Sequence, residues 1–125
     1  MSIEALKYMN SLLKGIGIPY EYSRWNSGQP PDYYFVGEYF ESPSMTREEN
    51  GFQESTFILR GYTRTEWMAL EEAKEKILNG VTKTAILPNG NGIAIFYESA
   101  MPVPTADMAV KSIKINLNVQ EWSVN

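Results

Sequence analysis

The side chains that could do chemistry in this sequence are carboxylates, lysines, tyrosines and serines, because the chain contains neither cysteine nor histidine. That absence removes thiol nucleophiles, imidazole acids and bases, and the usual zinc ligands. Acidic residues gather in one region, at Asp32, Glu38, Glu41, Glu48 and Glu49. Glycoside hydrolysis needs two carboxyl groups facing each other across roughly 5–10 Å, one of them kept protonated. Nothing in the spacing pairs these acids, so solvated loop and edge charges are expected.

The sequence also lacks the motifs of a metal site or a phosphate-binding loop. A magnesium site could use the same acids, but a phosphate loop or an ordered Asp-x-Asp spacing is missing. Gly90 and Gly92 form a Gly-x-Gly pair, yet the sequence after Gly92 has the pattern of a strand, whereas a phosphate loop must lead into a helix. We therefore expect a non-enzymatic protein with no catalytic residue, no metal site and no cofactor.

An aromatic cluster is the other feature that could bind something. It comprises Tyr20, Tyr22, Trp25, Tyr33, Tyr34, Phe35, Tyr39 and Phe40. Because side chains alternate along a strand, some of these rings are expected in the core and others on the opposite face. The exposed rings could form a protein interface, where Tyr and Trp are enriched, or line a small-molecule cavity.

Length and charge narrow the class of protein. A chain of 125 residues is expected to form one domain, 1–125, with a core large enough to need no disulfide or metal. The net charge of -4, with scattered Lys and Arg, argues against direct nucleic-acid binding. The first residues do not resemble a signal sequence, and no run of ~18 apolar residues occurs. We expect a soluble protein made in the cytoplasm, without membrane contact.

The hydrophobic patterns predict an α+β domain in the order α-β-β-β-α-β-β. It is expected to hold a mixed, mainly antiparallel sheet of about five strands, with two helices on one face. The predicted elements are a helix at 3–15, strands at 18–25, 33–40 and 54–62, a helix ending at 79–80, a hairpin around 88–92, and a strand at 110–122.

Three local signals refine this outline. Thr63 and Glu66 have the spacing of a capping box, which predicts the start of the second helix. Residues 42–51 are polar and charged, and are expected to form a loop long enough to reach a partner. Residues 99–108 contain two prolines and are expected to be irregular.

The last strand has the most regular pattern. Ile113, Ile115, Leu117 and Val119 share one parity, whereas Ser112, Lys114, Asn116, Asn118 and Gln120 share the other. One face should therefore pack into the core while the other meets water or a partner. A strand of this length exceeds the usual range, and it could lend its polar side to a neighbouring subunit. A long strand with a solvated back is the simpler alternative.

Three segments carry a resemblance to a known family: "SLLKGIGIPYEY", "FILRGYTRTEWMALEEAKEKI" and "ADMAVKSIKINLNVQEW". Their order and the chain length resemble the tail terminator proteins of long-tailed bacteriophages, the tail-completion and head-tail joining group. The resemblance covers nearly the whole chain and matches an arrangement of elements. It implies a ring, usually of six subunits, that caps the tail tube and meets the head connector. Such a protein would be a structural part of the virion tail, assembled in the cytoplasm of the host bacterium.

This resemblance makes two groups of residues candidates for the interface with other copies, with the tail tube protein or with the head connector protein. They are Arg47, Glu48 and Glu49 in the loop, and Lys114, Asn116, Asn118 and Gln120 on the last strand. Two other functions remain open. A small-ligand-binding regulatory domain would use the aromatic strands as pocket walls. An acidic immunity or inhibitor protein would use its charge to mask a basic enzyme.

Overall fold

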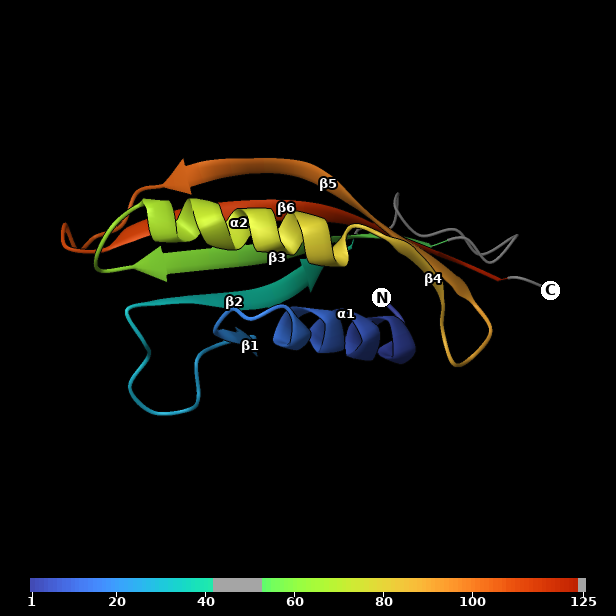
Figure 1. Cartoon of the computed structure of the whole chain (residues 1–125). Coiled ribbons are helices and arrows are strands. Elements are labelled where there is room, and N and C mark those ends of the chain that lie inside the picture. The colour runs from blue at the N-terminus through green and yellow to red at the C-terminus, as the bar shows by residue number, and fades with distance from the viewer. Residues whose placement is uncertain (42–52, 124–125) are drawn as a thin grey trace.

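The computed structural model describes residues 1–41 and 53–123, which form a six-stranded mixed sheet with two helices (Figure 1). The expected α+β class is confirmed, with six strands instead of about five because the hairpin and the last strand together supply three. The elements are α1 (Ile3–Gly15), β1 (Tyr20–Tyr22), β2 (Tyr33–Phe40), β3 (Gln53–Thr63), α2 (Met68–Val81), β4 (Thr84–Ile86), β5 (Gly92–Val103) and β6 (Lys111–Trp122). The loop expected at 42–51 lies outside the described residues.

The sheet has the strand order β1-β2-β3-β6-β5-β4. The short β1 pairs with β2 in parallel, and every other neighbouring pair is antiparallel. The last strand in the sequence therefore lies inside the sheet, with β3 on one side and β5 on the other. In Figure 1, β5 runs along one edge of the sheet and β1 lies at the other.

Both helices cover the same face of the sheet and close a single core. The expected parity of β6 is confirmed, because Ile113, Ile115, Leu117 and Val119 are buried. These residues belong to one cluster with the buried faces of the helices, which are Ala5, Met9 and Leu13 of α1 and Leu70, Ala73, Ile77 and Val81 of α2. The 3.6-residue period of the helices and the two-residue period of the strands thus meet in one apolar layer.

The start of α2 differs from the prediction. Its N-cap is Trp67, whose side chain makes no capping hydrogen bond. Thr63 ends β3, and its Oγ1 accepts a hydrogen bond from the backbone N–H of Thr65 at 3.2 Å. The capping box was therefore wrong, because the ladder between β3 and its neighbours extends to Thr63 and delays the helix. At the other end, α2 continues past Gly80 to Val81, which is fully buried.

The hairpin at residues 88–92 is confirmed, but β5 is longer than predicted. Gly90 has φ +89°, as a tight Asn-Gly turn requires, and β4 pairs antiparallel with the start of β5. Strand β5 then continues to Val103, across residues expected to be irregular, with a bulge between Tyr97 and Ser99. Pro102 is tolerated because β5 has no strand neighbour on its outer side at that point in the described sheet.

Candidate functional site

One whole face of the sheet is left uncovered by the helices, and we call it the open face. It carries the residues whose parity is opposite to that of the core positions. The predicted interface residues of β6 lie there, namely Lys114, Asn116, Asn118 and Gln120, and all four are partly buried. The other predicted group, Arg47, Glu48 and Glu49, lies outside the described residues.

The amides on the open face are linked to one another and to the neighbouring strands. Nδ2 of Asn118 donates to Oε2 of Glu54 at 3.0 Å, and Nε2 of Gln120 reaches the same oxygen at 3.3 Å. Nε2 of Gln120 also lies 3.0 Å from Oδ1 of Asn118, while Nδ2 of Asn116 donates to Oγ of Ser99 at 3.0 Å. Side chains held in this way present a largely preformed polar surface, since much of their rotamer freedom is already lost.

The length of β6 has a cause within the chain. Residues Lys111–Glu121 pair with β3, and Ser112–Trp122 pair with β5. A central strand must match the lengths of both neighbours, so no second subunit is needed to explain its twelve residues. The length of β6 therefore gives no support to a neighbouring subunit, and the proposed use of its uncovered polar side stays a prediction.

Positive charge crosses the middle of the open face. Arg60 and Lys114 are direct cross-strand partners. Nε of Arg60 lies 3.1 Å from Oε2 of Glu38 on the next strand, and both groups are substantially exposed. Among the described residues, no carboxylate lies within ion-pair distance of Lys114. Like charges placed opposite each other are unfavourable, so an acidic group from a partner would be stabilising here.

Two rings of the aromatic cluster, together with Tyr62 of β3, form one wall of a shallow hollow on the open face. Tyr34 stacks on its cross-strand partner Tyr62 with ring centroids 5.2 Å apart, and Trp25 lies 5.4 Å from Tyr34. The hollow has a volume of about 270 Å³ and is also lined by Arg24 and Arg60. Nε1 of Trp25 is buried and has no hydrogen-bond partner among the described residues. The remaining rings divide as expected, with Tyr20 and Phe35 in the core.

Large apolar side chains also reach the open face. Phe40, Ile86, Phe96 and Met101 are each about half exposed or more, at 55%, 65%, 49% and 51% respectively. They come from strands on both sides of β6. Because such residues surround a row of bonded amides, the open face combines apolar contact area with hydrogen-bonding groups, as protein interfaces do.

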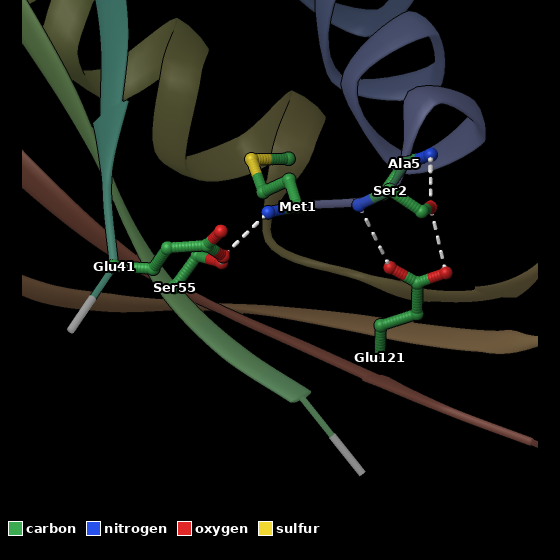
Figure 2. A network of polar contacts seen from close by, with 6 residues as sticks. All are labelled: Met1, Ser2, Ala5, Glu41, Ser55 and Glu121. Atoms are coloured by element: carbon green, nitrogen blue, oxygen red, sulfur yellow. Dashed lines mark hydrogen bonds and ion pairs between the residues drawn. The ribbon is translucent and has the colours of Figure 1, made fainter. Parts of the chain in front are cut away.

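A separate polar network fixes the first residues of the chain against the sheet (Figure 2). The amino group of Met1 lies 2.6 Å from Oε2 of Glu41, which also accepts from Oγ of Ser55 at 3.1 Å. Oγ of Ser2 donates to Oε2 of Glu121 at 2.7 Å and caps α1 by accepting from the N–H of Ala5. The hydrogen bond from the Met1 amino group holds the pKa of Glu41 below its ordinary value.

Glu121 is a buried carboxylate that the sequence analysis did not single out. It shares the core parity of β6 with Ile113 and Val119. Its Oε2 also accepts from Nδ2 of Asn91 at 3.1 Å, so one carboxylate joins α1, β6 and the hairpin. A charged residue on the apolar parity of a strand is the sequence signal that could have identified it. Its contacts here are structural.

The acids considered for catalysis are dispersed. Asp32 is exposed in a loop, Glu38 lies on the open face, and Glu41 contacts Met1 on the other face. Within residues 1–41 and 53–123, no three acidic side chains gather in a way that could hold a metal ion. The sequence also contains one Ser-x-x-Lys spacing, a pattern found where a lysine assists a serine nucleophile, at Ser11 and Lys14. Both side chains are exposed on α1, whereas a lysine base must be desolvated to act.

No helix in the described part of the chain is long and apolar enough to cross a membrane. In comparisons with known proteins, no family model matches the sequence, and no curated protein matches it.

Proposed function

We propose that this protein is a non-catalytic structural component of a long-tailed phage, a ring that caps the tail tube and joins it to the head connector. The resemblance in the order of elements suggests this function. The observation that carries it furthest is the open face, a sheet surface with a preformed amide row and several half-exposed apolar side chains.

The composition of the open face favours a protein partner. Antiparallel sheets often leave one face in water, and such faces are normally polar. Here Phe40, Phe96 and Met101 each expose about half of their side chains on that face. The register sets them apart, with Phe40 and Phe96 three strand steps from each other in the row of Asn118 and Met101 in the row of Lys114, so they frame the amide row and do not form one patch. A ring subunit has several surfaces to cover, since it contacts two neighbours and the ends of two other assemblies.

The test is to add purified protein to phage tail tubes and to image the tube ends. We expect capped ends with the wild type and bare ends with Lys114→Glu, because the substitution reverses a charge at the centre of the open face. Lys76→Glu makes the same change on the exposed side of α2, and it serves as the matched control that should still cap. Bare ends with the wild type, or equal capping by both variants, would refute the proposal.

The aromatic hollow supports a second candidate, a small-ligand-binding regulatory domain. Its three rings could stack on a planar ligand, while Arg24 and Arg60 could pair with an acidic group. The volume of about 270 Å³ lies just below the range of about 300–1,000 Å³ that is usual for ligand sites. A panel of planar carboxylates, screened by thermal shift, tests this function. Stabilisation of the wild type that is lost in Tyr34→Ala would favour it over the ring.

A further inference from the structure

The outer edge of β5 is open over most of its length. The three residues of β4 pair only with Gly92–Ala94, and the N–H of Ile95 donates to the carbonyl of Lys83 at 3.0 Å. From Phe96 to Val103, β5 has no strand on its outer side in the described sheet. We call this stretch the free edge of β5. A free edge presents unpaired backbone groups that can template another strand.

The backbone direction along the free edge follows from the register. The backbone N–H of Ile95 points to the outer side of β5, because it donates to the carbonyl of Lys83. The backbone groups of every second residue along a strand point to the same side. The backbone groups of Tyr97 therefore also point outward. The bulge between Tyr97 and Ser99 shifts the alternation by one residue, so the next outward backbone groups are those of Ala100 and Pro102. Pro102 has no N–H to lose there, which agrees with this assignment. Tyr97 and Ala100 therefore offer their amides and carbonyls at the edge.

The free edge carries a bulge, Pro102 and Glu98, which are partial blocks to pairing, but no lysine and no covering strand among the described residues. Natural edges are often blocked by lysine or covered by a loop or helix. Strand β5 contains no lysine or arginine, and Glu98 is its one charged residue. Phe96, Tyr97 and Met101 are each about half exposed along the same stretch, so apolar side chains flank the unpaired backbone on both faces. The bulge and Pro102 limit pairing only locally.

The opposite edge of the sheet is formed by β1, and it matches the free edge in position. Following the register across the sheet, the row that begins at Tyr22 ends at Ala100. The row that begins at Tyr20 ends at Pro102. Strand β1 runs opposite to β5, because it is parallel to β2 and three antiparallel steps separate β2 from β5.

The charges beside the two edges are also complementary. Arg24 follows β1 by two residues and is exposed, with its Nε bonded to Oδ1 of Asn26 at 3.1 Å. Glu98 is exposed at the bulge of β5. In an antiparallel extension of the sheet, the turn that follows β1, which begins at Ser23 with φ +74°, lies beside the stretch of β5 before Ala100 that contains Glu98. A positive group would then meet a negative one.

From these observations we propose that the free edge of β5 binds the β1 edge of a second copy of this chain, antiparallel, so that the sheet continues from subunit to subunit. This inference deepens the proposed function, because a ring requires a contact between two different surfaces of one chain. The open faces of successive copies then form one continuous surface. Main-chain hydrogen bonds to the outward groups of Tyr20 and Tyr22 supply affinity, and the Tyr22 carbonyl is shared with the N–H of Arg24, which lies 2.9 Å from it. The pair Arg24 and Glu98 fixes the direction of the contact.

A two-fold contact between two β5 edges is the competing arrangement. It would place Glu98 near Glu98 of the other copy, with the two bulges facing each other, and it would leave Arg24 outside the contact. The two arrangements therefore respond differently to charge reversal. Only the contact between β5 and β1 is sensitive to Arg24.

The experiment compares Glu98→Arg, Arg24→Glu and an equal mixture of the two variants, by sedimentation and native mass spectrometry up to about 1 mM, where weak self-association is measurable. Each variant alone places like charges at every contact, so we expect self-association at least about fivefold weaker than in the wild type. In the mixture, alternating subunits restore opposite charges at every contact, and association should recover. Glu66→Arg makes the same charge change on an exposed residue away from both edges and should behave as wild type.

A backbone variant gives an independent measurement. Ala100→Pro removes an outward amide at an edge position where proline is tolerated, so the monomer should stay folded and lose self-association. In the wild type, the amides of Tyr97 and Ala100 should exchange hydrogen more slowly at high concentration. A wild type that remains monomeric, a mixture that does not recover, or unchanged association of Ala100→Pro would overturn the proposed contact.

These outcomes separate the contact from the proposed function. Self-association that follows the charge pattern, in a protein that ignores tail tubes, would refute the tail function and leave the contact standing. Capping of tubes by the wild type, together with self-association that does not follow the charge pattern, would refute the contact and leave the tail function standing.

Discussion

Replacement of Ile115 is the sharpest test of how the sheet is oriented, because Ile115 and Asn116 are adjacent in the middle of β6 and face opposite sides. Ile115 is fully buried against the helices, and Asn116 is partly buried on the open face. We compare Ile115→Ala with Asn116→Ala, two truncations to the same residue at neighbouring positions. Both variants place alanine in the middle of the same strand, so the difference between their losses of unfolding free energy reports mainly which face of the sheet each side chain occupies.

The expected magnitudes differ severalfold. Ile115→Ala removes three buried carbon groups at ~0.8 kcal/mol each, and a cavity term raises the loss to about 3–4 kcal/mol. Asn116→Ala removes the hydrogen bond from Nδ2 to Oγ of Ser99, worth about 0.5–1.5 kcal/mol. Domains have total unfolding free energies of about 5–15 kcal/mol. Ile115→Ala should therefore remove a large part of the stability of the fold, and Asn116→Ala only a small part.

Urea unfolding at protein concentrations low enough to keep the chain monomeric measures both values. With a slope of about 1–3 kcal/mol/M, Ile115→Ala should lower the midpoint by roughly 1–4 M without changing the slope. Asn116→Ala should lower it by less than half as much. Equal losses would mean that β6 is buried on both faces, and the open face would not exist.

Two further predictions concern close packing and pH. Gly61→Ala should destabilise by about 1–3 kcal/mol, because a new Cβ would lie 2.4 Å from the ring of Phe35, whereas Gly15→Ala meets nothing within 4 Å and should be nearly neutral in the same unfolding assay. The lowered pKa of Glu41 means that its contact with Met1 stabilises the fold above the ordinary pKa of a glutamate and is lost as pH falls through the lowered value. The unfolding free energy of wild type should thus fall more steeply on acidification than that of Glu41→Gln, and identical pH profiles would contradict this assignment.

Much of the local structure could be predicted because it depends on short-range periodicity. The two parities of the last strand, the apolar spacing of α1 and the Asn-Gly hairpin each use information within a few residues. The α+β class followed from the same patterns. The capping box failed although it is also a local signal. Thr63 was recruited by strand pairing with residues far away in the sequence, and local propensity yields to such pairing.

The surface residues could be predicted only in part. Lys114, Asn116, Asn118 and Gln120 were placed on the correct side by parity alone. Their partners could not be predicted, because Glu54 and Ser99 meet them through the strand order. The hollow beside Trp25 likewise required Tyr34 and Tyr62 to be cross-strand neighbours.

The sequence by itself determined which residues of each strand and helix would be apolar together, since that choice is written in periods of 2 and 3.6 residues. Only the tertiary structure decided the order of the strands, the common side of the two helices, and therefore which face and which edge stayed free. Strand β5 illustrates the reason. Pro102 would be expected to interrupt a strand, but it is harmless here because β6 pairs with the inner side of β5 and no strand of the described sheet pairs with its outer side, where the missing N–H would point.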